Sequence, residues 1–377
     1  MDMRMFQNKP VSLLGYGCMR FPTQEKDGKR TILRAEAEKL LDCAYAGGVN
    51  YYDTAYGYHG GESESFLGEA MKKSPRESFY FATKLPIWMM KDDGPERMEE
   101  IFSDQLKRLQ TDYIDFYLLH GVDEEGFETV KRLGAYDFIR KKQAEGKVRH
   151  VGISFHDTPE VLERILDAYA FDFVQIQLNY LDWTLQNAKR QYELLEERGI
   201  PCVVMEPVRG GQLASLAPED EARLKAARPD EGVPAWAFRF LQSLPDVTVT
   251  LSGMNNLQQA KENIATYEQA KPLNEQEMAL VLSIADGIIR RTTVPCTACH
   301  YCVSHCPKHL PIPDLLKLYN EAMVAGSGMF IAPMALSAIP AEHQPSACIA
   351  CHSCEKVCPQ QIHIPDALAD FARRMGK

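Results

Sequence analysis

Four side chains that can exchange protons stand at or just beyond the ends of apolar segments. Asp53 and Tyr58 follow one such segment, Lys84 ends a second, and His120 ends a third. Aromatic and β-branched residues precede each of them, which is typical of buried strands. Strands that end on one rim would bring a carboxylate, a phenol, an ammonium and an imidazole together. That set is a proton-transfer site in outline.

Strand and helix patterns alternate over about the first 270 residues. Residues 1 to about 10 are expected to form a short hairpin or cap. Strands are predicted at 11–17, 50–54, 79–84, 115–120, 150–155, 173–178, 203–206 and 247–252, and helices at 35–46, 63–72, 97–109, 130–145, 159–168, 188–198, 233–241 and 257–269.

Eight strands, each followed by a helix, predict an α/β fold of the (β/α)8 TIM-barrel type, in which chemistry lies where the strands end. A doubly wound open sheet is the alternative. Against it, no Gly-x-Gly-x-x-Gly turn follows the first strand, so the usual dinucleotide fingerprint of that fold is missing.

Three short motifs in this region resemble the aldo-keto reductases. Residues 53–58 read Asp-Thr-Ala-Tyr-Gly-Tyr, residues 83–84 read Thr-Lys, and residues 118–120 read Leu-Leu-His. The likeness extends from about residue 15 to 263. It implies an NAD(P)H-dependent oxidoreductase that reduces an aldehyde or ketone to an alcohol by hydride transfer.

The resemblance also implies a role for each of the four side chains. Tyr58 would be the general acid, although a phenol with a pKa of ~10 is a reluctant acid at neutral pH. Lys84 would stabilise the phenolate, Asp53 would keep the lysine charged, and His120 would hold the carbonyl oxygen. Tyr56 is a competing tyrosine. The family usually has Gly directly after its tyrosine, whereas His59 stands here.

The same resemblance implies a site for NADP(H) or NAD(H). Its residues would be Ser154, Gln175, Met205, Pro207, Arg209, Gly210, Gly211, Gly253, Gln259, Glu262 and Asn263. The first two match positions that hold the nicotinamide carboxamide in relatives. The loop 206–211 could cradle the pyrophosphate with its backbone amides, or could be a turn that needs positive φ.

Two positions depart from the family pattern. Met205 replaces a tyrosine that often stacks on the nicotinamide, which predicts weaker stacking. No Arg or Lys occurs between residues 253 and 260 to pair with a 2′-phosphate, so these residues do not indicate a preference for NADPH.

Eight of the 11 cysteines follow residue 295, and they form a repeat. Each half reads Cys-x-x-Cys-x-x-Cys-x-x-x-Cys-Pro, and the second half is displaced by 52 positions. An Ile-Pro-Asp sequence at 312–314 recurs at 364–366 with the same offset, each opening an amphipathic helical run. The other three cysteines, at 18, 43 and 202, lie in apolar settings and are interpreted as small buried hydrophobes.

This repeat resembles the bacterial two-cluster ferredoxins, which bind two 4Fe-4S clusters. In such domains the fourth cysteine of each motif crosses to the other cluster. One cluster would take Cys296, Cys299, Cys302 and Cys358, and the other Cys348, Cys351, Cys354 and Cys306. Two four-cysteine zinc sites are the alternative, but they would not require a third cysteine in each run. The nearby histidines are expected to be neighbours of the clusters or surface groups and not ligands; they are His300, His305, His309, His352 and His363.

These motifs divide the chain into a barrel at 1–271, a helical linker at 272–294 and a small, mainly helical ferredoxin-like domain at 295–377. The net charge of -10 makes nucleic acid an unlikely partner. No export signal and no apolar window of membrane-spanning length occurs, so we expect a cytoplasmic protein without a membrane partner.

A hydride carries two electrons, whereas each cluster passes one at a time, and no flavin motif is evident to link them. The favoured hypothesis is therefore a carbonyl reductase whose clusters are structural or serve a separate redox partner protein. One alternative is an iron-sulfur electron-transfer protein whose barrel is a scaffold or nicotinamide sensor. Another is a flavin or substrate radical that joins the two halves.

Overall fold

Eight parallel strands close into a barrel in the computed structural model, which describes residues 1–26, 28–325 and 331–376. The strands are β3 (Leu14–Gly17), β6 (Tyr51–Asp53), β7 (Tyr80–Pro86), β8 (Ile114–Val122), β9 (Val148–Phe155), β10 (Phe173–Gln177), β11 (Cys202–Met205) and β12 (Val247–Ser252). They pair in chain order, and β12 returns to β3. The predicted (β/α)8 barrel is confirmed.

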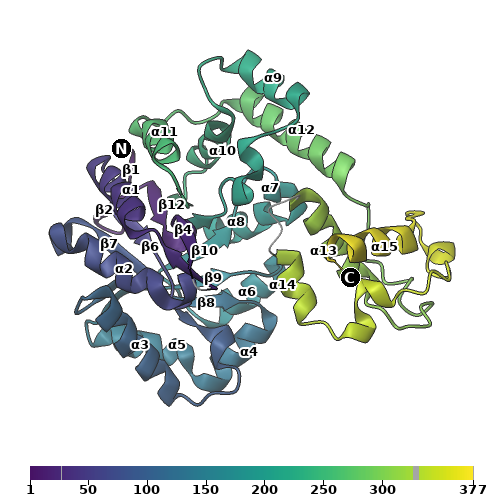
Figure 1. Cartoon of the computed structure of the whole chain (residues 1–377), viewed down its shortest axis with the longest axis horizontal. Helices are drawn as coiled ribbons and strands as arrows, with labels where there is room; N and C mark the ends of the chain where they lie inside the picture. Colours follow the sequence, from purple (N-terminus) through teal and green to yellow (C-terminus); the bar gives the residue numbers. More distant parts are fainter. Residues whose placement is uncertain (27, 326–330, 377) are drawn as a thin grey trace. The chain divides into compact units, whose positions relative to one another are not determined.

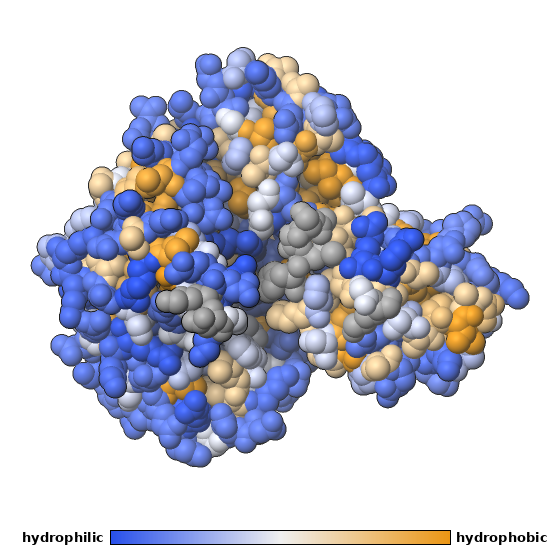
Figure 2. Space-filling view, in the orientation of Figure 1, coloured by the Kyte–Doolittle hydropathy of each residue, from blue (hydrophilic) through white to orange (hydrophobic). Residues whose placement is uncertain are grey.

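Helices lie outside the barrel strands, as Figure 1 shows for α1 to α6. They are α1 (Arg34–Ala46), α2 (Glu62–Ala70), α3 (Glu96–Leu109), α4 (Glu124–Leu133), α5 (Ala135–Ala144), α6 (Pro159–Ala168), α7 (Asp182–Leu185), α8 (Ala188–Glu197), α10 (Val233–Gln242) and α11 (Leu257–Glu268). Their faces follow the helical period. In α3, for example, Met98, Ile101, Phe102 and Leu109 are buried. Hydrophilic residues predominate on the outward side of α2 to α5 in Figure 2.

Three parts of the barrel differ from the expected boundaries. The single helix predicted at 130–145 is two helices, because Gly134 adopts φ 65° between α4 and α5. The strand predicted at 11–17 is also divided. Its first residues belong to β2 (Lys9–Ser12), which pairs with β1 (Met3–Phe6), and only β3 enters the barrel. A second hairpin, β4 (Thr23–Lys26) with β5 (Lys29–Ile32), was not predicted.

The β1–β2 hairpin contributes to the barrel core. Phe6 and Val11 from the hairpin cluster with Phe116, Phe173 and other side chains of the barrel strands. The Phe6 and Phe116 rings meet edge to face, with centroids 5.0 Å apart. The interior is thus packed with apolar side chains, and the polar groups gather where the strands end.

The described residues form two compact units. The barrel unit contains 1–207 and 228–278, and the second unit contains the described parts of 208–227 and 279–377. The elements of the second unit are η6 (Arg209–Ala214), α9 (Pro218–Ala227), α13 (Ile312–Ala325), α14 (Ile331–Ser337) and α15 (Ile364–Arg374), with short 3₁₀ turns at 341–343, 345–347 and 355–357. Helix α12 (Glu275–Thr292) passes from the first unit to the second. The domain boundaries given above stay a prediction.

The repeated Ile-Pro-Asp sequences open α13 and α15, so the two halves of the cysteine repeat each lead into a helix. Leu315 and Leu316 of α13 and Leu368 and Phe371 of α15 are buried in one apolar cluster. This cluster is the core of a mainly helical unit, as the spacing of the repeat indicated.

Candidate functional site

Lys84 lies at the centre of the polar group on the barrel. Its Nζ donates hydrogen bonds to Oδ1 of Asp53 at 2.6 Å and to the carbonyl of Thr54 at 2.8 Å, and it lies 3.4 Å from Oη of Tyr58. The Lys84 side chain is fully buried and that of Asp53 is 4% exposed. The ring of His120 meets the ring of Tyr58 edge to face, with centroids 5.9 Å apart. The structure therefore brings all four predicted side chains together.

Strand register places three of these side chains on neighbouring strands. Asp53 at the end of β6 pairs with Ala82 of β7, two residues before Lys84. His120 of β8 pairs with Pro86 of β7. The backbone of Lys84 is also held from outside the barrel, because Nε2 of Gln105 donates to its carbonyl at 3.0 Å.

Tyr58 is held by a turn whose next three residues are left-handed. His59, Gly60 and Gly61 have φ of 53°, 64° and 93°. Such a conformation favours glycine, but Nε2 of His59 makes a 3.1 Å hydrogen bond with the carbonyl of Cys18. The departure from the family pattern at His59 thus keeps a glycine-like backbone and adds an anchor for the loop.

Burial and charge act against each other on these groups. Burial raises the pKa of the Tyr58 phenol, and the Lys84 ammonium offsets part of that rise. Burial also raises the pKa of Asp53, against the effect of Lys84. For Lys84, burial favours the neutral amine, but Asp53 and Tyr58 outweigh it and raise the pKa. Tyr58 therefore holds its proton at neutral pH beside a charged ammonium.

Two histidines at this end of the barrel are neutral at pH 7. Burial, with Lys84 and His156 nearby, holds the pKa of His120 well below its ordinary value. Burial and Lys84 lower the pKa of His156 to about 4. His156 was not predicted as a site residue from the sequence, although it directly follows β9 in the way that the other polar groups follow their strands.

The residues predicted to hold the nicotinamide carboxamide lie on the next two strands, Ser154 near the end of β9 and Gln175 in the middle of β10. Ser154 of β9 and Gln175 of β10 are 1% and 2% exposed. Nε2 of Gln175 is 3.5 Å from Sδ of Met205, whereas its Oε1 is buried and has no hydrogen-bond partner among the described residues. Oδ2 of Asp53 and Nδ1 of His120 are likewise buried and unpaired in that part of the chain. Buried polar atoms of this kind usually have partners, so a ligand with hydrogen-bonding groups fits them.

The predicted pyrophosphate loop is divided between the two units. Met205 and Pro207 belong to the barrel unit, and Arg209, Gly210 and Gly211 belong to the second unit. Arg209 has φ 48° and the two glycines have φ 65° and 102°, so the turn that needs positive φ is present. The Arg209 guanidinium pairs with Glu321 of α13.

The predicted adenine contacts surround the start of α11. Asn256 caps the helix by accepting a hydrogen bond from the backbone N–H of Gln259 at 3.0 Å. Glu262 is exposed, and Nδ2 of the buried Asn263 donates to Oγ of Ser252 at 3.0 Å. Gly253 lies against Arg20, whose side chain leaves no room for a Cβ at this position.

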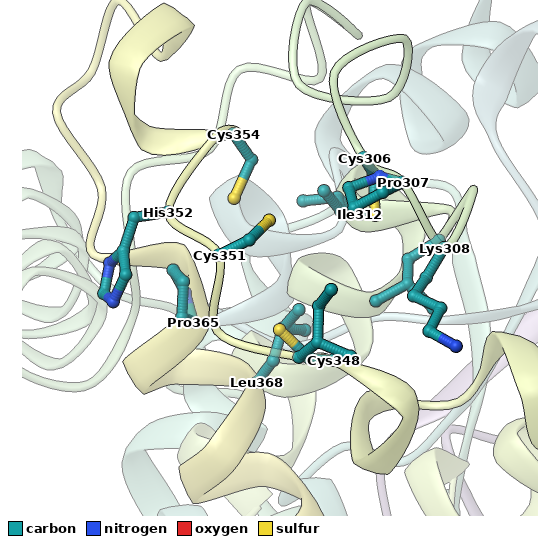
Figure 3. Close-up of a pocket in the computed structure, with 12 residues that line it drawn as sticks. Cys306, Pro307, Lys308, Ile312, Cys348, Cys351, His352, Cys354, Pro365 and Leu368 are labelled. Atoms are coloured by element: carbon teal, nitrogen blue, oxygen red, sulfur yellow. The ribbon is translucent and has the colours of Figure 1, made fainter.

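The eight clustered cysteines line two recesses in the second unit. Cys348, Cys351 and Cys354 share one recess with Cys306, and Figure 3 shows the sulfur atoms of Cys351 and Cys354 directed into it. The other recess is lined by Cys296, Cys299, Cys302 and Cys358. Each recess measures about 310 Å³, counting space open to solvent. The fourth cysteine of each motif thus lies with the first three of the other.

The backbone around the recesses repeats as the cysteines do. Six residues other than glycine are left-handed in three pairs that are 52 positions apart, namely Ala298 and Ala350, His300 and His352, and His309 and Gln361. Left-handed residues among helical ones direct successive N–H groups into a concave anion site. Backbone hydrogen bonds from Ala298 and Ser353 to the thiols of Cys296 and Cys351 lower the pKa of those thiols, although burial outweighs this effect at Cys296.

Comparisons with known proteins agree with this geometry. The parallel barrel, with a lysine, a tyrosine, an aspartate and a histidine in contact near its strand ends, is a TIM barrel with a proton-transfer site. Residues 13–286 match the model of the aldo/keto reductase family, and residues 295–363 match that of the 4Fe-4S dicluster domain. The chain therefore belongs to the aldo/keto reductase family, whose members act on small molecules, and it carries a 4Fe-4S domain after the barrel.

The curated relatives are about a quarter to a third identical to it over the aligned residues. A probable aldo-keto reductase of Glycine max is 33% identical over 54% of this chain and 58% of its own length. An NADH-specific methylglyoxal reductase of Escherichia coli is 27% identical over 66% and 86%. The holo form of an aldo-keto reductase from Bacillus halodurans superposes with a TM-score of 0.60 at 28% identity, over 75% of this chain and 96% of that one. Among the described residues, none of the helices has the length and apolar character needed to cross a membrane.

Proposed function

We propose that this protein reduces an aldehyde or ketone to an alcohol with NADH or NADPH as hydride donor, and that Tyr58 supplies the proton. One observation carries the proposal: the chain of contacts from the buried Asp53 through the buried Lys84 to the half-buried Tyr58. A carbonyl accepts hydride readily only when its oxygen gains a proton or a strong hydrogen bond as charge develops. These side chains provide both.

Each residue has one task in this scheme. Tyr58 donates its phenolic proton to the carbonyl oxygen, and Lys84, 3.4 Å away, stabilises the phenolate that remains. Asp53 keeps Lys84 charged and in place. The neutral imidazole of His120 donates a hydrogen bond that orients the carbonyl oxygen.

The nicotinamide cofactor, when bound, supplies the hydride. Ser154 and Gln175 would hold its carboxamide, and the unpaired Oε1 of Gln175 suits a carboxamide N–H. Met205, Pro207, Arg209, Gly210, Gly211, Gly253, Gln259, Glu262 and Asn263 would contact the rest of it. No Arg or Lys at 253–260 is present to select NADPH through its 2′-phosphate, and comparing the dissociation constants of NADH and NADPH determines the preference.

The two recesses fit two 4Fe-4S clusters, which would supply one-electron transfer. Each recess has four cysteines, and the left-handed segments provide inward N–H groups that suit an anionic cluster. No three His, Cys, Asp or Glu side chains in the described parts of the chain converge as they would on a single metal ion. The third cysteine in each run, which a four-cysteine zinc site would not require, supports clusters over the zinc alternative. We propose that the clusters are structural or serve a separate redox partner, since hydride transfer does not need them.

Replacing Tyr58 by Phe tests the enzymatic proposal. Loss of the hydroxyl should lower turnover of NADH with 4-nitrobenzaldehyde by about 10²- to 10⁴-fold and leave the dissociation constant of NADH unchanged. Tyr56→Phe is the matched control, because the Tyr56 ring packs under the Arg108 guanidinium, 4.2 Å from ring centroid to Cζ. Unchanged turnover in Tyr58→Phe would exclude Tyr58 as the acid.

An anaerobic titration with NADH shows whether the barrel and the clusters exchange electrons. NADH added without a carbonyl should leave the visible absorption of the clusters unchanged, while carbonyl-dependent oxidation of NADH proceeds. Bleaching by NADH alone would show that electrons pass from the nicotinamide to the clusters.

A further inference from the structure

His156 and Ser154 form a pair at the end of β9. Nε2 of His156 lies 3.2 Å from Oγ of Ser154. The His156 backbone N–H donates to the carbonyl of Val122 on β8 at 3.1 Å, which fixes the residue against the neighbouring strand. The Ser154 side chain is buried, whereas His156 is solvent-accessible.

We propose that His156 is a positioning residue that fixes the Ser154 hydroxyl as a hydrogen-bond donor to the carboxamide oxygen of the bound nicotinamide. The inference rests on the proposed function, because it takes the nicotinamide to lie against Ser154 and Gln175. It gives His156 a role that none of the motifs above assigns.

Hydrogen-bond donors and acceptors must match between the carboxamide and the side chains that hold it. A carboxamide offers one acceptor oxygen and an NH₂ donor group. The unpaired Oε1 of Gln175 accepts from the NH₂ group, which leaves the carboxamide oxygen in need of a donor. Ser154 has only one hydroxyl proton. That proton is available to the ligand only when His156 donates from Nε2 to the serine oxygen, and not when Nε2 accepts.

The charge state and tautomer of His156 decide whether its Nε2 donates to Ser154 or accepts from it. Lys84 and His120 are the titratable groups that act on it, and the pKa of His156 is lowered, first because neighbouring protein groups partly desolvate the exposed ring and then because of Lys84. The ring is therefore neutral at pH 7, with one proton shared between two possible nitrogens. A ligand oxygen at Ser154 favours the tautomer with the proton on Nε2.

The binding of NADH and its analogues tests the Ser154–His156 pair without a measurement of catalytic turnover. We expect His156→Leu to raise the dissociation constant of NADH, measured by titration calorimetry, by about 3- to 10-fold. A change of this size corresponds to the loss of one hydrogen bond. The reduced thionicotinamide analogue, whose sulfur is a weak acceptor, should lose much less affinity. His156→Gln should bind NADH nearly as the parent protein does, because an amide N–H can replace Nε2–H.

Gln175→Met is the control for the other half of the carboxamide, its NH₂ group. It should weaken NADH and the thionicotinamide analogue, but not the reduced 3-acetylpyridine analogue, which has no amide N–H. In a Ser154→Ala background, His156→Leu should have no further effect on NADH affinity. Thermal unfolding of His156→Leu and His156→Gln, followed by circular dichroism, confirms that both variants are folded.

Two outcomes overturn the proposal, and they differ from failure of the proposed function. If His156→Leu weakens NADH and the thionicotinamide analogue equally, or weakens neither, His156 does not act through the carboxamide oxygen. If the unmodified protein binds none of the three nucleotides, the nicotinamide assignment itself is wrong, and the inference falls with it.

Discussion

Nη2 of Arg209 donates hydrogen bonds to both carboxylate oxygens of Glu321, although 112 positions separate the two residues. Their side chains are only 6% and 12% exposed. Arg209 lies in the loop that we propose for the cofactor pyrophosphate, and Glu321 lies on α13, whose first turn contributes Ile312 and Pro313 to the cysteine recesses. The loop and α13 are therefore one connected part of the second unit.

Glu321→Gln should destabilise the second unit by about 1.5–3 kcal/mol, the range for hydrogen bonds to charged groups. The isosteric amide keeps the volume but removes the charge that faces the buried guanidinium. The urea dependence of the visible cluster absorption measures the change. Glu342→Gln, at an exposed acid of the same unit, is the control. Equal midpoints for both variants would show that the ion pair contributes little.

Lys84→Met should move the pH dependence of alcohol oxidation to higher pH. In that direction Tyr58 accepts a proton, so the rate rises with pH as the phenol ionises. Burial raises the pKa of Tyr58 and Lys84 lowers it, so removing the ammonium leaves only the upward effect. The midpoint of the kcat profile with NAD⁺ and a benzyl alcohol measures the shift. Lys142→Met, at another largely buried lysine that pairs with Glu99 and Glu145, should leave the midpoint in place.

The sequence was sufficient to predict the barrel and the strand ends, because apolar runs bounded by polar residues are local patterns. It did not reveal that helix 130–145 breaks, since amphipathic spacing continues through Gly134 and only its positive φ ends α4. It also gave no means of pairing Arg209 with Glu321, because no local pattern joins residues so far apart.

In the candidate site, too, some residues could be placed from local sequence patterns and others could not. Asp53, Lys84 and His120 could be placed from their strands, but the approach of Tyr58 depends on a left-handed turn in which His59 stands in for glycine. His156 carried the same signal as the others, a polar residue after a strand. It was missed because the family resemblance implied a role for Ser154 and none for His156.

Acid should destabilise the barrel through its two neutral histidines. The pKa values of His120 and His156 are lowered in the folded protein, the latter to about 4, whereas an unfolded histidine titrates near ~6.5. Between these values the unfolded chain binds more protons, so the free energy of unfolding falls as the pH drops from ~6.5 towards about 4. All three tryptophans, at 88, 183 and 236, belong to the barrel unit, so urea unfolding followed by tryptophan fluorescence reports on it.

His156→Gln isolates one histidine from the carboxyl groups that titrate in the same range. Its unfolding free energy should depend less steeply on pH between 6.5 and 4 than that of the parent protein. His305→Gln, at an exposed histidine of the second unit, should leave the slope unchanged. Identical slopes for the parent protein and His156→Gln would mean that His156 titrates normally in the folded state.

Paired cysteine variants test the crossover of the fourth ligand. Cys358 shares a recess with Cys296 and not with Cys348, although it follows Cys348 in the same motif. If each recess holds one cluster, Cys296→Ser with Cys358→Ser damages a single site and should retain roughly half of the iron and sulfide. Cys348→Ser with Cys358→Ser damages both sites and should retain little.

Cys202→Ser is the control for the loss of a thiol as such, because Cys202 is buried in β11, within the barrel unit. Iron and acid-labile sulfide in anaerobically purified protein give the result directly. The reverse order, with more iron in Cys348→Ser/Cys358→Ser than in Cys296→Ser/Cys358→Ser, would mean that each motif binds its own cluster. In that case the shared recesses would have to rearrange when the clusters bind.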